Sequence, residues 1–200
     1  PLTLHKRLQE KIHAIGAAAL KGVGGRIIVK TNALTDEPLI RALIQAGQNG
    51  VRIDLIVRGA CMLPPGLPGQ TDNIRVRSIV GRFLEHTRVF YFRSGDAEDV
   101  YLSSADWMNR NMLRRVELAW PVSDPAIRRR VIDECLVPYL LDARDAWTMD
   151  GAGNYRCVST PPHGDARGAQ ESLARRYAEL AGSSDDRDGL VRRHAQRPGE

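Results

Sequence analysis

The sequence predicts an α/β fold in which helices flank a mixed β-sheet, followed by a polar tail. Segments with helical and with strand character alternate through about the first 155 residues of the 200-residue chain. One run of consecutive strands interrupts the alternation, which favours a sheet with both parallel and antiparallel neighbours. We therefore expect one domain over residues 1–158 and a separate tail over residues 159–200.

The first part of this domain is expected to alternate helix and strand twice. Apolar residues at helical spacing predict a helix that ends near Leu20, just before a glycine-rich stretch. The next segment, RIIVK at 26–30, is rich in β-branched residues, as buried strands are. Thr35 is the expected N-cap of the second helix, and VRIDLIV at 51–57 is the second strand.

The second part contains the run of strands. They are expected at 74–79, 87–92, 100–104 and 116–122. In the first of them, Arg75 and Arg77 lie on one face, because side chains alternate along a strand. Asp124 and Pro125 then begin a helix whose apolar residues repeat every fourth position as far as Tyr139.

The tail differs from the domain in composition. Prolines and glycines begin it, and few large apolar residues follow. Such a segment cannot bury enough apolar surface to offset the entropy of ordering. We expect it to be mostly disordered, with one short helix near 171–180.

Composition excludes some classes of protein. No apolar stretch is long enough to cross a bilayer, and no secretory signal is apparent. The three cysteines have neither metal-ligand spacing nor a disulfide pattern, which favours a reducing, cytoplasmic setting. A net charge of +5 suits a polyanionic partner. The absence of an initial methionine suggests a fragment of a longer protein.

The segment SIVGRFLEHTRVFYF at 78–92 carries the first chemical signal. His86 and Arg88 are two residues apart, which on a strand places both side chains on one face. A histidine exchanges protons near neutrality, and an arginine presents a planar fork to phosphate oxygens. The pair is therefore suited to phosphoryl chemistry. The alternative is a half-exposed histidine at a strand edge, without a role.

Arg58 is a second candidate, because it follows an apolar strand. Open α/β sheets usually present their ligand-binding groups at the carboxyl ends of strands. A surface arginine or a structural ion pair is the alternative. For Arg75 and Arg77, a phosphate contact and a solvated face are equally open.

Two serines and an aspartate follow the expected strand at 100–104. Ser103, Ser104 and Asp106 are candidates to orient His86, although strand-end capping explains the serines equally well. Their segment, YLSSADWMNRN, resembles the Gly-Ser-x-Asn element that follows the histidine motif of phospholipase D-like enzymes. Relative to that motif, Arg88 replaces a lysine and Arg93 replaces an aspartate.

Four longer segments extend the resemblance. They look like the C-terminal half of bacterial polyphosphate kinases, in that family's order and spacing: VRIDLIVRGAC, NIRVRSIVGRFLEHTRVFYF, VYLSSADWMNRNMLRRVE and VSDPAIRRRVID. The resemblance implies a phospholipase D-like fold, one of two such domains that enclose a tunnel. It also implies reversible transfer of the γ-phosphate of ATP to polyphosphate, through a phosphohistidine and with Mg²⁺.

By the same resemblance, His86 matches the active-site histidine of the second domain, which contacts nucleotide phosphates. Arg58 matches a nucleotide-binding arginine, and Arg75, Arg77 and Arg88 are candidates for phosphate or polyphosphate contacts. The phosphorylated histidine belongs to the preceding domain, and nothing here matches it. No metal ligand of the protein itself is expected, and this chain alone is expected to be inactive.

The implied partners are ATP or ADP, inorganic polyphosphate and the rest of a kinase chain. A full-length enzyme is expected to be a cytoplasmic homo-oligomer, with peripheral membrane association as part of a larger complex. Two alternatives stay open: a non-catalytic fragment that binds nucleotide or polyphosphate, and a phospholipase D-like phosphodiesterase. No recognition motif supports a nucleic-acid partner.

Overall fold

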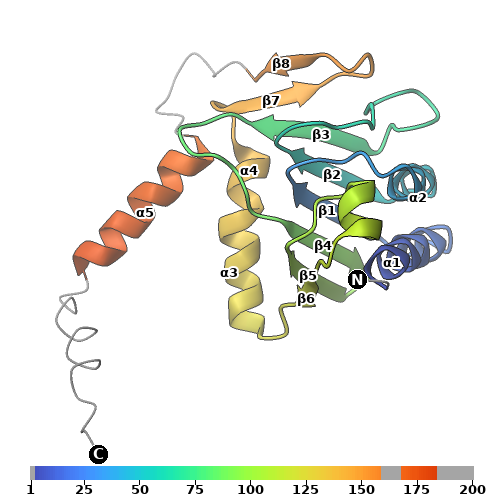
Figure 1. Cartoon of the computed structure of the whole chain (residues 1–200), viewed down its shortest axis with the longest axis horizontal. Coiled ribbons are helices and arrows are strands. Elements are labelled where there is room, and N and C mark those ends of the chain that lie inside the picture. The colour runs from blue at the N-terminus through green and yellow to red at the C-terminus, as the bar shows by residue number, and fades with distance from the viewer. Residues whose placement is uncertain (1–2, 159–167, 184–200) are drawn as a thin grey trace, which may run out of the picture.

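The computed structural model describes residues 3–158 and 168–183, and eight strands within them form one mixed sheet (Figure 1). Its strand order is β6-β5-β4-β1-β2-β3-β7-β8. The strands are β1 (Gly25–Thr31), β2 (Arg52–Val57), β3 (Ile74–Ile79), β4 (Val89–Ser94), β5 (Ala97–Ser103), β6 (Ala119–Pro121), β7 (Ala146–Met149) and β8 (Tyr155–Cys157). The pairs β1–β2 and β2–β3 are parallel, and all other neighbours are antiparallel.

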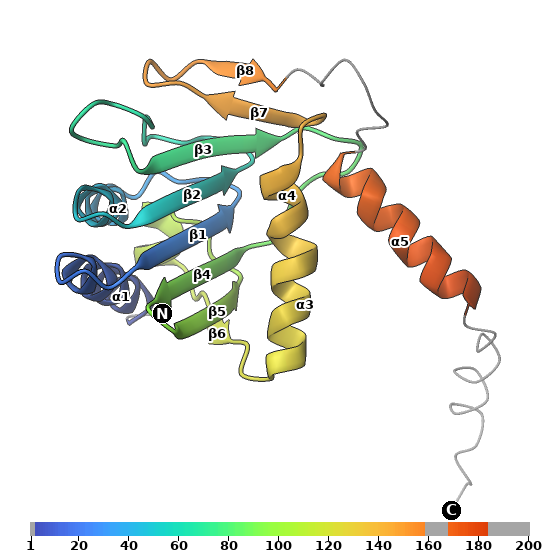
Figure 2. The same ribbon diagram turned by 180° about the vertical axis from the view of Figure 1, so that it is seen from behind.

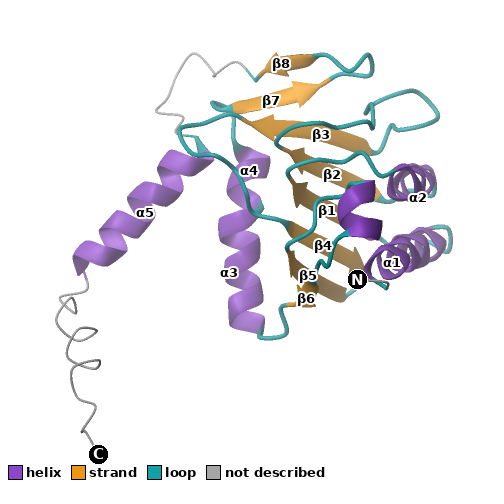
Figure 3. Ribbon diagram, in the orientation of Figure 1, coloured by secondary structure: helices purple, strands orange, loops and turns teal. Residues whose placement is uncertain are grey.

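Helices cover both faces of this sheet (Figures 2 and 3). The helices are α1 (Leu4–Ala19), α2 (Glu37–Gln48), the π-helix η1 (Arg110–Arg114), α3 (Pro125–Cys135), α4 (Val137–Leu141) and α5 (Ala169–Ser183). One apolar core lies between the sheet and α1 with α2, and a second lies on the face covered by α3 and α4. The expected α/β fold with a mixed sheet is therefore confirmed. None of the described helices is long and apolar enough to span a membrane.

Most of the expected elements form, with shifted ends. β3 spans the expected residues, and α3 begins after an Asp124 side chain that accepts a hydrogen bond from the Ile127 amide. The N-cap of α2 is Asp36, whose carboxylate accepts from the Leu39 amide, and not Thr35. Pro38 stands at the start of this helix, where the missing amide proton costs nothing.

Three further expectations were wrong. β4 begins at Val89, so His86 and Arg88 lie in the connection before it rather than on a strand. The strand expected at 116–122 is reduced to β6. The helix expected to continue through Tyr139 ends at Cys135, and Pro138 lies at the start of the separate helix α4.

Two short strands, β7 and the edge strand β8, were not predicted. They pair through a turn in which Gly153 has a positive φ of 85°. In the tail, α5 forms slightly beyond the expected 171–180 helix at both ends. The rest of the expected disordered tail lies outside the described residues.

Candidate functional site

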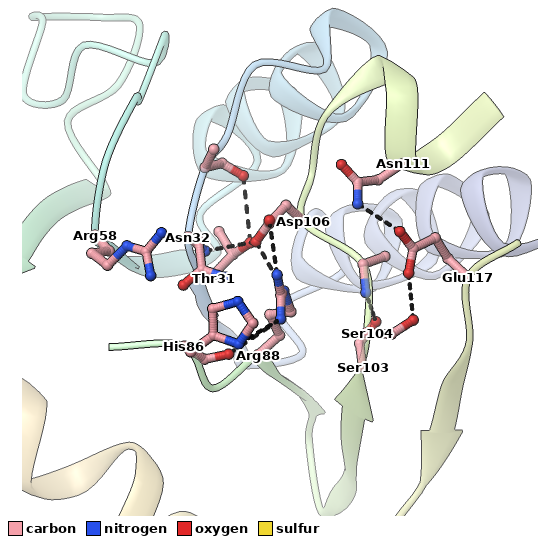
Figure 4. Close-up of polar contacts among 12 residues, drawn as sticks. Thr31, Asn32, Arg58, His86, Arg88, Ser103, Ser104, Asp106, Asn111 and Glu117 are labelled. Atoms are coloured by element: carbon pink, nitrogen blue, oxygen red, sulfur yellow. Dashed lines mark hydrogen bonds and ion pairs between the residues drawn. The ribbon is translucent and has the colours of Figure 1, made fainter. Parts of the chain in front are cut away.

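The candidate residues meet at one edge of the sheet. β1 and β2 are parallel and end there, β4 begins there opposite the end of β1, and β5 ends beside the start of β4. Asn32, Arg58, Arg88 and Ser104 are therefore brought together from four separate segments. Figure 4 shows Arg58, His86 and Arg88 beside the end of β1, with Asp106 behind them.

Asp106 is the centre of the buried part of this site. Its Oδ1 accepts hydrogen bonds from the Thr31 hydroxyl at 3.0 Å and from the Asn32 amide at 2.8 Å. Arg88 approaches the same carboxylate with two nitrogens, Nε to Oδ1 at 3.0 Å and Nη2 to Oδ2 at 3.1 Å. Burial by itself raises the pKa of Asp106, but the bonds from Arg88 and Asn32 outweigh it and hold the pKa below its ordinary value.

Arg88 in turn reaches His86. Its Nη1 donates to the His86 carbonyl at 3.2 Å and lies 3.4 Å from the imidazole Nδ1. The imidazole is exposed, whereas Asp106 is 7% exposed. Asp106 therefore fixes Arg88 from the interior, and Arg88 fixes the backbone and the ring of His86 at the surface.

Arg58 holds the same segment from the other side. Its Nη1 donates to the carbonyl of Glu85 at 2.5 Å, immediately before His86. The backbone around Arg58 is itself fixed, because its carbonyl accepts from Ser78 Oγ at 3.0 Å and its amide donates to Thr31 at 3.2 Å. The two candidate ligand-binding residues, Arg58 and His86, are thus coupled through one residue.

Beneath Glu85 lies a buried ion pair. Lys30 Nζ is 2.8 Å from Glu85 Oε2 and 3.1 Å from the centroid of the Tyr139 ring. Burial lowers the pKa of the Lys30 ammonium, although Glu85 favours its charged form. Burial and the Glu85 carboxylate both raise the pKa of Tyr139. The polar groups below His86 are therefore ordered as well as buried.

A pocket of about 560 Å³ opens beside His86. Residues 83–87 form one wall, and Tyr139 and the first turns of α5 form the others. Such a volume is in the range of small-molecule sites.

Ser103 and Ser104 face another direction. Ser103 Oγ donates to the Leu118 carbonyl at 2.9 Å, and Ser104 Oγ donates to Glu117 at 2.5 Å. Glu117 also accepts from the Asn111 amide at 2.6 Å. The hydrogen bonds of both serines join β5 to the segment before β6, as the capping alternative expects, while Asp106 connects to His86 through Arg88.

The match to a protein family agrees with this geometry. Residues 1–170 match the family described as polyphosphate kinase C-terminal domain 2. The chain belongs to this family. The match extends past the boundary expected at residue 158 and includes the start of α5.

Named relatives of this polyphosphate kinase domain are much longer. The polyphosphate kinase of Burkholderia cenocepacia is 55% identical over 156 residues, which are 78% of this chain and 23% of that protein. That of Paraburkholderia phytofirmans is 51% identical over 177 residues, 88% of this chain and 26% of that protein. The chain therefore spans about a quarter of the length of the curated relatives it matches.

A solved structure shares the fold. The crystal structure of polyphosphate kinase from Porphyromonas gingivalis superposes with a TM-score of 0.83 at 36% identity. The superposition covers 91% of this chain and 28% of that one. The arrangement of β-sheet and helices is therefore that of part of a polyphosphate kinase.

Arg75 and Arg77 of this domain point to the same face, as expected, but differ in surroundings. Arg77 Nη1 donates to the carbonyls of Tyr139 at 3.0 Å and Leu140 at 2.6 Å. The guanidinium of Arg77 therefore caps the carbonyls at the end of α4. Arg75 is exposed and borders a separate pocket of about 390 Å³.

Several residues of the site were missed from the sequence. Thr31 and Asn32 end β1 just as Arg58 ends β2, so the rule that indicated Arg58 applies to them too. The side-chain nitrogen of Asn32, Nδ2, is buried and has no hydrogen-bond partner among the described residues. Glu85 was not singled out from the sequence, and it pairs with Lys30.

The polyphosphate kinase domain offers no metal cage in its described part. Residues 3–158 and 168–183 contain no cluster of three His, Cys, Asp or Glu side chains that could hold a metal ion. Cationic and hydrogen-bonding groups, rather than carboxylates, dominate the exposed side of the site. This arrangement is suited to binding anionic oxygens.

Proposed function

We propose that this chain is the ATP- and polyphosphate-handling C-terminal domain of a polyphosphate kinase. The intact enzyme transfers the γ-phosphate of ATP to inorganic polyphosphate, reversibly, through a phosphohistidine in the preceding domain. The family match supports this reaction, and the juxtaposition of His86 and Arg58 supports the site. The chain supplies one half of the active site and is expected to be inactive alone.

The observation that carries the proposal is the hydrogen bond from Arg58 to the Glu85 carbonyl. It places a permanent cation next to an exposed histidine at the edge of the sheet. Phosphoryl transfer depends mainly on positioning and on neutralising charge on the transferred group. Arg58 supplies charge to nucleotide phosphates, and the His86 imidazole contacts phosphate and exchanges a proton.

The other arginines have different parts in the proposal. Arg88 keeps its Asp106 pair and orients His86, whose carbonyl accepts a hydrogen bond from Arg88 Nη1. Arg75 is free to contribute to a path for polyphosphate, whereas Arg77 is engaged by the α4 carbonyls.

Mg²⁺ belongs to the proposal as a companion of ATP. Magnesium commonly binds substrate phosphates and keeps several waters, so it needs few protein ligands. Homo-oligomerisation, cytoplasmic location and membrane association of the full-length enzyme stay predictions.

The proposal is tested in the full-length kinase that contains this chain, by measuring polyphosphate synthesis from ATP. Replacing His86 with alanine is expected to lower kcat by at least about 100-fold, the usual contribution of a proton-transferring group. Arg58→Ala is expected to raise KM for ATP by about 10–100-fold, because it removes hydrogen bonds to a charged ligand. Arg58→Lys keeps the positive charge but loses the planar guanidinium, so its KM for ATP is expected to lie between those of wild type and Arg58→Ala.

Arg41→Ala is the matched control. Arg41 is exposed on α2, where it pairs only with Glu37 four residues earlier among the ion pairs of the described chain. Its replacement is expected to leave synthesis unchanged. Wild-type kinetics for both His86→Ala and Arg58→Ala would refute the proposed site.

A further inference from the structure

The segment that carries His86 has little structure of its own. Residues 80–88 connect β3 to β4 without regular secondary structure. Phe83 and Leu84 within it are 54% and 78% exposed, so apolar burial contributes little to holding it. The position of His86 must therefore be set by specific polar anchors.

One anchor comes from α5, in the region expected to be a separate tail. The Gln170 amide is 6% exposed and makes three hydrogen bonds to this segment. Its Oε1 accepts from the Phe83 amide at 2.7 Å, and its Nε2 donates to the Phe83 carbonyl at 2.7 Å. The same Nε2 donates to Glu85 Oε1 at 2.6 Å. Figure 1 shows the segment between β3 and β4 passing the first turn of α5.

Glu85 transmits this contact to the site. Gln170 holds one carboxylate oxygen of Glu85, and Lys30 lies 2.8 Å from the other. The Glu85 carbonyl accepts a hydrogen bond from the Arg58 guanidinium. All three anchors converge on Glu85, the residue directly before His86, and Gln170 reaches it from α5.

The first turn of α5 is itself fixed to the domain. Asp142 Oδ2 accepts from the Ala169 amide at 2.6 Å, and Asp142 Oδ1 accepts from the Arg144 and Asp145 amides. A Cβ on Gly168 would lie 2.0 Å from Asp145 Oδ2, so a larger residue would require the Asp145 side chain to move. Gln170 therefore lies on a helix whose first turn is hydrogen-bonded to the domain.

We propose that Gln170 is a positioning residue of the kinase site, which sets the place of His86 by clamping Phe83 and Glu85. This inference rests on the proposed function, because it assumes that His86 takes part in phosphoryl transfer. Without Gln170, the Phe83 amide and carbonyl and one Glu85 oxygen lose these hydrogen bonds, and residues 82–87 shift. A displacement of about 1 Å at a reacting group costs about 100-fold in rate.

The test compares Gln170→Ala and Gln170→Met with wild type in the full-length kinase. Methionine has nearly the length of glutamine but removes the hydrogen bonds, so it preserves packing if the alanine variant fails to fold. Both variants are expected to lower kcat about 10–100-fold while changing KM for ATP less than about 3-fold. Hydrogen exchange of the Phe83 amide is expected to accelerate in both, because its acceptor is gone.

Glu179→Ala is the control on the same helix, since it breaks the exposed Arg175–Glu179 ion pair at 2.8 Å, away from residues 82–87. It is expected to leave kcat and Phe83 exchange unchanged. Wild-type kcat in Gln170→Met would overturn the inference, and so would a rise in KM alone, which would make Gln170 a ligand contact. A lowered kcat in His86→Ala alongside a normal Gln170→Met would refute the inference but keep the proposed function, whereas wild-type kinetics in both His86→Ala and Arg58→Ala would refute the proposed site itself.

Discussion

Both carboxylate oxygens of Asp106 accept hydrogen bonds from the guanidinium of Arg88, Oδ1 from Nε at 3.0 Å and Oδ2 from Nη2 at 3.1 Å. Arg88 and Asp106 lie 18 residues apart, on either side of β4 and β5. The same carboxylate accepts from the Thr31 hydroxyl and the Asn32 amide at the end of β1. The Asp106 side chain thus links the end of β1, the segment before β4 and the segment after β5, and it holds the arginine that contacts His86.

Asp106→Asn should destabilise the domain and impair the site. The change leaves the Arg88 charge without its partner in a largely buried place, and breaking such a pair costs about 3 kcal/mol. Urea denaturation of wild type and variant measures the difference in free energy of unfolding. The same variant in the full-length kinase should show reduced polyphosphate synthesis. Equal stability would mean that the pair contributes nothing.

The contribution of Asp106 should depend on pH. Its pKa is held below the ordinary value in the folded state, so its stabilisation is present above the unfolded pKa of about 3.9. It is lost as the pH falls through the lower folded pKa. The stability difference between wild type and Asp106→Asn should therefore be constant near neutrality and shrink below about pH 4. Urea midpoints across this range measure it, and a difference that grows in acid would contradict the assignment.

Glu85→Gln should be costly, because it leaves the buried Lys30 ammonium without a counter-charge. We expect a loss of about 3 kcal/mol in the free energy of unfolding. The double variant Lys30→Met with Glu85→Gln should recover most of it, since it removes the unpaired charge. Glu37→Gln, which breaks an exposed pair with Arg41, is the control and should cost less than about 1 kcal/mol. Additive losses in the double variant would argue against the pair.

Arg77→Ala and Arg75→Ala should differ despite their shared strand face. Arg77 satisfies two carbonyls at the end of α4, and its loss should cost about 1–3 kcal/mol. Arg75 is exposed, and its replacement should change stability by no more than about 0.5 kcal/mol. Thermal unfolding of both variants provides the comparison. Similar melting temperatures would show that the α4 contacts are unimportant.

Local patterns predicted much of the fold. Strand alternation fixed the limits of β3, and the Asp124-Pro125 pair fixed the start of α3. These signals depend on residues close together in the chain, where the spacing of apolar side chains and helix capping act. β7 and β8 were not predicted because they are only four and three residues long, which leaves almost no alternation of apolar and polar side chains to detect.

The sequence indicated several residues of the candidate site, but it did not indicate the contacts that join them. Local sequence signals were enough to predict the order of helices and strands, the position of Arg58 after β2 and the proximity of His86 to Arg88. Three contacts are seen only in the folded chain: Asp106 pairs with Arg88, Lys30 pairs with Glu85, and Gln170, 85 residues from Glu85, hydrogen-bonds to the same segment. Such contacts depend on how strands and helices pack against one another, and the periodicity of a single segment does not indicate which distant segments will lie beside it.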